Sequence, residues 1–224
     1  MTARVVALLG AESTGKTTLA QELAGVLRGR GVAVAVVAEY LREFCDANGR
    51  TPTPAEQHQI AAEQAARIEA AAAAHAFVIA DTTPVMTAVY SDFVFGDRAL
   101  YASALAWQRR QVALTLVTGL DLPWRADGLQ RDGPQVRVPV DALLRDALAG
   151  AGIGHATIYG SGAARTAAAL AALAPLLGGL ESTGDARSAV DGAPFTRWRA
   201  RCAECLQPDC EHLARLLPEL PRTP

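Results

Sequence analysis

Gly10-Ala11-Glu12-Ser13-Thr14-Gly15-Lys16-Thr17 is the stretch that decides the fold, because it matches the phosphate-binding pattern G-x-x-x-x-G-K-[ST] at every fixed position. Lys16 is also the one lysine among 21 basic residues, the others being arginine. A phosphate cradle favours a slim ammonium group within a ring of backbone N–H groups over a wide, planar guanidinium. The retained lysine therefore supports the motif, and the stretch predicts binding of a nucleoside triphosphate.

The segments on either side of this loop provide the context that the motif requires. Residues 5–9 form a short apolar run typical of a buried parallel strand, and residues 17–27 carry apolar side chains near helical spacing. We expect the backbone N–H groups from Glu12 to Thr17 to surround the β-phosphate, Lys16 to bridge the β- and γ-phosphates, and the Thr17 hydroxyl to bind Mg²⁺. The candidate nucleotide-binding residues are Gly10, Glu12, Ser13, Thr14, Gly15, Lys16, Thr17 and Thr18.

Strand-like and helix-like segments alternate along the rest of the chain. Further strands are expected at residues 32–38, 77–80, 113–117 and 156–159, and helices at 54–74, 98–111, 141–149 and 163–177, with a loop at 121–139. This alternation predicts an α/β fold in which helices cover both faces of a parallel sheet. Regular periodicity fades after Gly178, so we expect a domain at residues 1–178 and a C-terminal extension at 179–224.

Composition argues against nucleic-acid and membrane partners, although local basic patches remain possible. The net charge of −2 over 224 residues gives no strong field toward nucleic acid or an anionic membrane. No apolar run reaches the length of about 18 residues that a membrane span needs. We expect no signal peptide, because the first residues lead directly into the strand expected at residues 5–9. We expect a soluble, cytoplasmic protein whose cysteines are reduced.

Two acidic residues follow predicted strands. Asp81 ends the strand at residues 77–80, where a carboxylate reaches the Mg²⁺ beside the phosphate loop. The alternative is a helix N-cap, which Thr82 or Thr83 would supply equally well.

Glu39 ends the preceding strand in the same way, within Glu39-Tyr40-Leu41-Arg42-Glu43. Its carboxylate would face the γ-phosphate from the acceptor side, which is the position of a general base. The alternative is a solvated loop acid paired with Arg42. Arg42 itself either holds the acceptor or a phosphate oxygen, or is a surface charge.

The segment from Pro123 to Gly133 combines Trp124, two arginines and two glycines. It is a candidate for closing over the phosphates, with arginines offsetting charge in the transition state. The alternative is an ordinary surface loop.

Four motifs together resemble the ribosylnicotinamide kinase domain of NadR-type proteins, over about residues 4–175: Gly10-x-Glu12-Ser13-x-Gly15-Lys16-Thr17, Glu39-Tyr40-x-Arg42-Glu43, Asp81-Thr82 and Pro123-Trp124-x-Ala126-Asp127-Gly128. The resemblance implies a P-loop three-layer sandwich with a five-stranded parallel sheet in the order 2-3-1-4-5. It also implies ATP- and Mg²⁺-dependent phosphorylation of nicotinamide riboside at its 5′-hydroxyl to give nicotinamide mononucleotide, a step of NAD biosynthesis.

The same resemblance implies roles for individual residues. Glu39 or Asp81 would lie near the acceptor hydroxyl, and Arg125 or Arg131 would act with Lys16 on the transferred phosphoryl group. The candidate substrate-binding residues are Glu39, Tyr40, Arg42, Trp124 and Asp127. The family usually has arginine directly after Leu129, whereas this chain has Gln130 and then Arg131, which leaves the register of the lid arginine open.

The C-terminal extension has chemistry of its own. Cys202, Cys205, Cys210 and His212 follow the spacing C-x₂-C-x₄-C-x-H, and three thiolates with one imidazole suit a tetrahedral Zn²⁺ site at residues 202–212. The alternative is a set of free thiols. The extension also motivates a second function hypothesis, an ATP-binding or ATPase regulatory module whose zinc-binding tail docks a protein or nucleic-acid partner.

Overall fold

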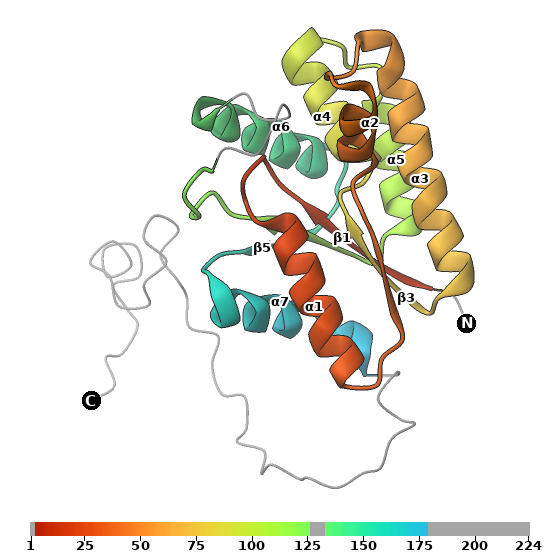
Figure 1. Ribbon diagram of the computed structural model, residues 1–224, viewed down its shortest axis with the longest axis vertical. Coiled ribbons are helices and arrows are strands. Elements are labelled where there is room, and N and C mark those ends of the chain that lie inside the picture. Colours follow the sequence, from red (N-terminus) through yellow and green to blue (C-terminus); the bar gives the residue numbers. More distant parts are fainter. Residues whose placement is uncertain (1–2, 126–132, 179–224) are drawn as a thin grey trace, which may run out of the picture. The chain divides into compact units, whose positions relative to one another are not determined.

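A computed structural model describes residues 3–125 and 133–178. The described strands form one sheet in the order β2-β3-β1-β4-β5, and each pair of neighbours is parallel, which confirms the expected topology (Figure 1). The strands are β1 (Arg4–Leu9), β2 (Val34–Val37), β3 (Phe77–Asp81), β4 (Leu114–Thr118) and β5 (His155–Ile158).

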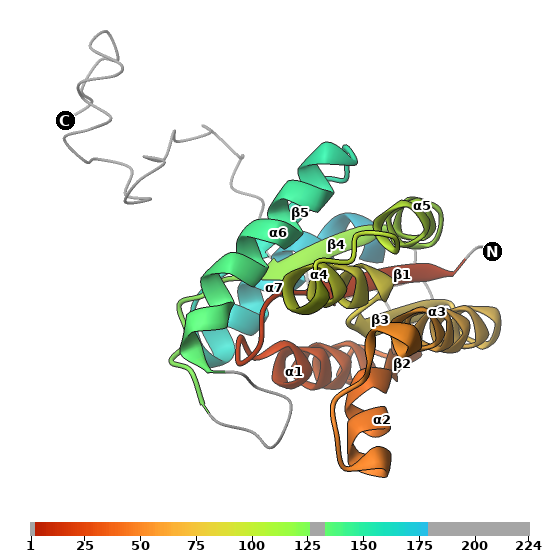
Figure 2. The ribbon, with the colours of Figure 1, turned by 90° about the horizontal axis from the view of Figure 1, so that it is seen from above.

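Helices cover both faces of this sheet (Figure 2). The helices are α1 (Lys16–Gly29), α2 (Tyr40–Asn48), α3 (Gln57–Ala74), α4 (Pro84–Phe95), α5 (Tyr101–Gln111), α6 (Arg137–Gly150) and α7 (Gly162–Leu177), with short 3₁₀ turns η1 (Pro54–Glu56) and η3 (Pro134–Val136). None of the described helices has the length and apolar character needed to cross a membrane.

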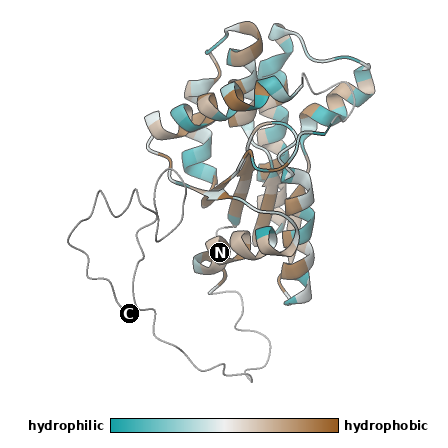
Figure 3. Ribbon diagram, turned by 90° about the vertical axis from the view of Figure 1, so that its left-hand side faces the viewer, coloured by the Kyte–Doolittle hydropathy of each residue, from teal (hydrophilic) through white to brown (hydrophobic). Residues whose placement is uncertain are grey.

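The central strand β1 shows how the two faces are built. Its side chains alternate between the faces, as strand geometry requires. Val6 and Leu8 pack with α1 and α7, whereas Ala7 and Leu9 pack with α4, α5 and α6. All four are fully buried, so both faces of β1 are dry, and the strands appear as an apolar layer beneath the helices in Figure 3.

Helix α2 was absent from the sequence-based expectation, which had only an acidic segment after the second strand. The helix begins directly after Glu39 and ends at Gly49, whose φ of 65° is the left-handed conformation that terminates many helices. Strand β2 is correspondingly shorter than the expected residues 32–38.

The expected loop at residues 121–139 was too long at its C-terminal end, because η3 and α6 begin before Pro139. A proline fits the first turn of a helix, where the backbone N–H has no intrahelical acceptor to lose. The helix expected at residues 98–111 is α5, and a further helix, α4, precedes it and ends at Phe95 before Gly96, which adopts φ 66°.

The carboxyl ends of all five parallel strands meet at one edge of the sheet. The segments that leave this edge begin at Gly10, Ala38, Thr82, Gly119 and Tyr159. Ligands of open parallel sheets bind outside this edge, so it is where a functional site is expected.

Candidate functional site

The phosphate loop joins β1 to α1 by a backbone path that few residue types tolerate. Ser13 and Gly15 have φ of 55° and 76°, and Gly10 has φ of 147°. A Cβ atom at Gly10 would lie 2.1 Å from Thr118 Oγ1 in the neighbouring strand. Gly10 is therefore required both for its backbone conformation and for the close approach of β4.

Lys16 is the first residue of α1, and its side chain folds back over the loop. Its Nζ donates hydrogen bonds to the carbonyl oxygens of Gly10 at 3.0 Å and Ala11 at 2.9 Å. The ammonium group thus lies across the mouth of the loop, beside the positive end of the α1 dipole. This arrangement concentrates positive charge where the sequence predicts the β- and γ-phosphates.

Asp81 and Thr17 meet across the sheet edge. The Thr17 hydroxyl donates to Asp81 Oδ2 at 2.5 Å, although 64 residues separate the two positions. Asp81 is 2% exposed, and its Oδ1 has no hydrogen-bond partner among the described residues. A buried carboxylate oxygen without a donor is costly unless a cation satisfies it. The donor set fits Mg²⁺, which prefers a few protein oxygens together with phosphate oxygens and water.

The alternative role of Asp81 as a helix cap is not observed. Thr83 is the N-cap of α4, with its side-chain oxygen accepting a hydrogen bond from the Val85 amide at 3.4 Å. The Thr83 hydroxyl also donates to Gln108 Oε1 at 2.8 Å, which ties α4 to α5.

A cavity of about 480 Å³ opens beside the phosphate loop. This volume lies within the range of about 300–1,000 Å³ that small-molecule sites occupy. The phosphate loop forms one wall, α2 and the start of α3 form a second, and α4 forms a third. The lining beyond the phosphate loop comprises Glu39, Leu41, Arg42, Cys45, Thr51, Pro52, Gln57, Thr82, Met86, Thr87, Tyr90, Val94 and Phe95.

Glu39 and Arg42 both line this cavity, and α2 places them on one face because they are three residues apart. The Arg42 guanidinium lies 3.9 Å from the Glu39 carboxylate. The ion pair that sequence analysis offered as an alternative is therefore present, and it lies within the cavity wall. Both residues can face a ligand there.

Tyr40 lies apart from them in the structure, and its role at the substrate stays a prediction. Its ring lies under the guanidinium of Arg67, 4.4 Å from that carbon to the ring centroid. Tyr40 is absent from the described lining of the cavity. Glu39 precedes the helix with extended backbone angles and Tyr40 is its first residue, so the two side chains face different neighbours.

Glu12 and Ser13 hold the segment that follows β4. The Trp124 indole N–H donates to Glu12 Oε1 at 2.9 Å, and the Gly133 amide donates to the same oxygen at 3.3 Å. The Arg125 amide donates to Ser13 Oγ at 2.7 Å. Trp124 is absent from the described cavity lining, and its indole N–H bonds to Glu12 of the phosphate loop; its role at the substrate stays a prediction.

Several predicted site residues lie outside the described residues. They are Asp127, Arg131, Cys202, Cys205, Cys210 and His212. The zinc site and the domain boundary near residue 178 stay predictions. Within residues 3–125 and 133–178, no cluster of three or more His, Cys, Asp or Glu side chains could hold a metal ion.

The apolar wall of the cavity was missed by the sequence analysis. Met86 and Tyr90 stand four residues apart on α4, and Val94 continues the same row. This spacing was visible in the sequence, but α4 is apolar around its whole circumference, so nothing local marked one stripe as a ligand wall. Cys45 is 3% exposed, and burial raises the pKa of its thiol.

The phosphate loop after β1, the sheet order and the Thr17–Asp81 contact define a P-loop, kinase-like class of nucleotide-binding fold. The chain belongs to the family described as "AAA domain", whose model matches residues 5–165. No curated protein matches the sequence.

Two solved structures have the same fold. A crystal structure of NadR protein in complex with NAD and AMP-PNP superposes with a TM-score of 0.62 at 20% sequence identity. A second NadR structure, in complex with NR, gives a TM-score of 0.61 at 20% identity. Each comparison covers 84% of this chain and 52% of the NadR chain, so this chain spans about half the length of the proteins it matches. The resemblance to NadR-type proteins is thereby confirmed at the level of the fold.

Proposed function

We propose that this protein is an ATP-dependent phosphotransferase that moves the γ-phosphoryl group of ATP to a hydroxyl of a small nucleoside-like acceptor. The observation that carries the proposal is the cavity between the phosphate loop, α2 and α4, which has Lys16 and Thr17 in one wall and Glu39 in another. The cavity extends from the phosphate loop to α2 and α4, and this extension would hold an acceptor beside the phosphates.

The two carboxylates have separate roles in this proposal. Asp81 contacts the Thr17 hydroxyl directly, so these residues would hold Mg²⁺, which when bound neutralises charge on the β- and γ-phosphate oxygens. Glu39 lies in the acceptor part of the cavity and is the candidate general base.

The reaction balances with these groups. The acceptor oxygen forms a bond to the γ-phosphorus while its proton passes to the Glu39 carboxylate. The bond between the γ-phosphorus and the β–γ bridging oxygen breaks, and ADP leaves. Lys16 offsets the charge that develops on the phosphoryl oxygens.

The cavity chemistry narrows the acceptor class. Met86, Tyr90 and Phe95 offer an apolar and aromatic surface, and Glu39 and Arg42 offer hydrogen-bonding groups in the same cavity. A ring attached to a hydroxyl-bearing sugar matches both. Nicotinamide riboside is the first acceptor to test, because the four sequence motifs resemble those of ribosylnicotinamide kinases and one fold neighbour was solved with NR.

The direct test is ADP release with Mg²⁺, ATP and a panel of nucleosides that begins with nicotinamide riboside. We expect one acceptor to stimulate release and Lys16→Ala to abolish it. Release that no nucleoside raises above background would overturn the phosphotransferase proposal, and steady acceptor-independent release would favour an ATPase.

Matched variants separate the two carboxylates. Glu39→Gln should lower kcat by about 10²–10⁴-fold, the usual contribution of a general base, without changing the Mg²⁺ requirement. Asp81→Asn should raise the Mg²⁺ concentration needed for half-maximal rate. Glu43→Gln is the control, because Glu43 lies in the first turn of α2, four residues after Glu39, but pairs with Arg67 at 2.6 Å and is absent from the described cavity lining. An equal loss in Glu39→Gln and Glu43→Gln would count against Glu39 as the base.

A further inference from the structure

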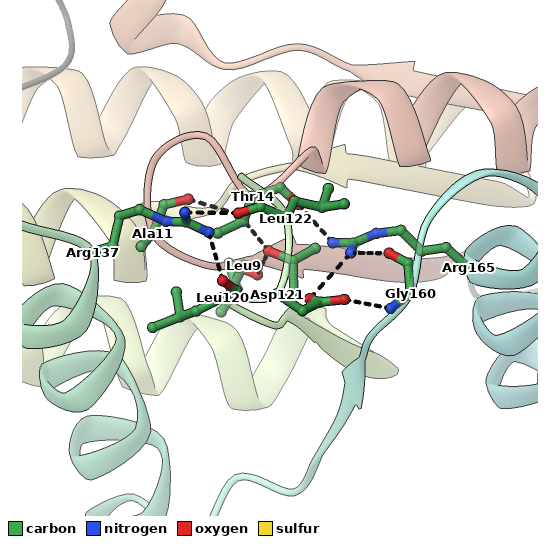
Figure 4. A network of polar contacts seen from close by, with 10 residues as sticks. Leu9, Ala11, Thr14, Leu120, Asp121, Leu122, Arg137, Gly160 and Arg165 are labelled. Atoms are coloured by element: carbon green, nitrogen blue, oxygen red, sulfur yellow. Dashed lines mark hydrogen bonds and ion pairs between the residues drawn. The ribbon is translucent and has the colours of Figure 1, made fainter. Parts of the chain in front are cut away.

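The phosphate loop is held from behind by an arginine of the last described helix. Arg165 lies in the first turn of α7 and is 4% exposed. Its Nη2 donates to the Thr14 carbonyl oxygen at 2.6 Å, and its Nη1 donates to the Gly160 carbonyl oxygen at 2.9 Å (Figure 4). One guanidinium thus joins the β1–α1 loop to the β5–α7 turn.

The bond to Thr14 fixes more than one carbonyl group. The peptide bonds described here are trans, so the Thr14 carbonyl and the Gly15 N–H point in opposite directions from the same plane. A carbonyl held by Arg165 therefore directs the Gly15 N–H away from α7. Because Thr14 and Gly15 both line the cavity, this amide is one of those available to a phosphate.

Asp121 supports the arginine in this position. Its carboxylate lies 3.6 Å from Arg165 Nη1 and accepts a hydrogen bond from the Gly160 amide at 2.5 Å. Burial lowers the pKa of Arg165 and the Asp121 charge opposes that shift. The two side chains and the Gly160 turn form a closed set of contacts behind the loop.

Local helix energetics do not explain an arginine at this position. A cation in the first turn of a helix meets the positive end of the helix dipole, which is unfavourable. The first turn of α7 has no acidic residue to offset it, and Arg165 Nε has no hydrogen-bond partner among the described residues. The contacts that Arg165 gains are those to the phosphate loop, the β5–α7 turn and Asp121.

The second buried arginine in Figure 4 shows the contrast. Arg137 of α6 donates to the carbonyl oxygens of Leu122 at 2.8 Å and Leu120 at 3.1 Å. Those carbonyls belong to the segment after β4. In these hydrogen bonds Arg137 braces a neighbouring segment, whereas Arg165 bonds to the phosphate loop itself.

We propose that Arg165 is a positioning residue for nucleotide binding, which acts through the Thr14 carbonyl to hold the phosphate loop in its anion-binding conformation, with Asp121 holding Arg165. The proposal rests on the proposed binding of a triphosphate by this loop. It predicts an effect on affinity for the nucleotide and none on affinity for the acceptor.

The test is binding of a fluorescent, non-hydrolysable ATP analogue to the full chain with Mg²⁺. Arg165→Met should raise the Kd at least about ten-fold, because a charge-assisted hydrogen bond to the loop is lost. Arg165→Lys should recover part of the affinity, since an ammonium group can reach one of the two carbonyls. Arg145→Met is the matched control, because Arg145 pairs with Asp141 at 2.7 Å and bonds to Thr157 at 3.1 Å, away from the phosphate loop. The Kd of this variant for the analogue should stay within about two-fold of the wild-type value.

Steady-state kinetics distinguish positioning from a general loss of structure. Arg165→Lys and Asp121→Asn should raise the KM for ATP while the KM for the acceptor stays unchanged, whereas partial unfolding would lower kcat and leave both KM values in place. A folded Arg165→Met variant that binds with wild-type affinity overturns the proposal. If that variant does not fold, wild-type affinity in both Arg165→Lys and Asp121→Asn overturns it.

Failure of the proposed function gives a different pattern. Tight analogue binding by wild type without transfer to any acceptor would remove the phosphotransferase activity but leave the Arg165 proposal intact. Wild-type binding by Lys16→Ala would show that the loop is not the nucleotide site.

Discussion

The hydrogen bond between Trp124 and Glu12 connects the phosphate loop to the segment after β4, and its energy can be measured. Trp124 Nε1 donates to Glu12 Oε1 at 2.9 Å, and the Gly133 amide reaches the same oxygen at 3.3 Å. Glu12 is 7% exposed, so water offers little replacement if a donor is removed. We expect Trp124→Phe and Glu12→Ala each to destabilise the fold.

The size of the effect follows from the chemistry of the contact. A hydrogen bond to a charged acceptor contributes about 1.5–3 kcal/mol to stability. Trp124→Phe removes this bond while keeping an aromatic ring, and should lower the free energy of unfolding by that amount. Glu12→Ala should cost at least as much, because the Gly133 amide also loses this acceptor. The double variant should resemble Glu12→Ala, which corresponds to a coupling energy of about 1.5 kcal/mol or more.

Urea unfolding followed by circular dichroism provides the measurement, and the chain contains its own control. Trp107 Nε1 donates to Glu69 Oε1 at 2.7 Å, so Trp107→Phe breaks a bond of the same kind elsewhere. In a double variant with Glu12→Ala, the losses in unfolding free energy of the two substitutions should add within about 0.5 kcal/mol. A coupling energy below about 0.5 kcal/mol between Trp124→Phe and Glu12→Ala would refute the reasoning. An equal coupling energy between Trp107→Phe and Glu12→Ala would refute it as well.

Two further predictions concern the loop and the surface. Gly10→Ala should lower the free energy of unfolding by about 2–4 kcal/mol, because it adds strain at φ 147° and places a Cβ atom 2.1 Å from Thr118 Oγ1. In thermal melts, the double variant with Thr118→Ala should recover part of this loss. An unchanged melting temperature in Gly10→Ala would contradict the close approach. Glu56 has its pKa lowered from 4.5 to about 2, first by its hydrogen bond from Arg50 and then by Thr53. A depressed carboxyl pKa stabilises the folded state above 4.5 and loses that effect as pH falls toward 2, so Glu56→Gln should flatten the decline of melting temperature across this window, and parallel curves for the two proteins would count against it.

The order of strands and helices was predictable because each signal is local. The strands at 5–9 and 77–80 were placed within a residue or so, since a short apolar run bounded by glycine or a polar residue has few alternatives. Helix α2 was missed because it is only nine residues long, so its apolar positions Leu41, Phe44 and Cys45 span little more than one turn and only Cys45 is buried. Pro139 concealed the first turn of α6 because proline usually marks a boundary.

The candidate site was predictable in part for the same reason. Residues that follow the strands of a parallel sheet gather at one edge, so Lys16, Glu39 and Asp81 could be placed together from their positions in the chain. The division of roles between Glu39 and Asp81 could not be predicted from the sequence. It depends on the Thr17–Asp81 contact and on the face of α2 that meets the cavity.

The sequence by itself determined the phosphate loop, the strand-to-helix alternation around it and the acids at the strand ends. These features depend on spacing over a few residues, where backbone geometry leaves little freedom. The tertiary structure alone decided that Trp124 binds Glu12, 112 residues away, and that Arg165 holds Thr14, 151 residues away. Such contacts are set by how helices pack on the sheet, and no local pattern specifies which side chains that packing brings together.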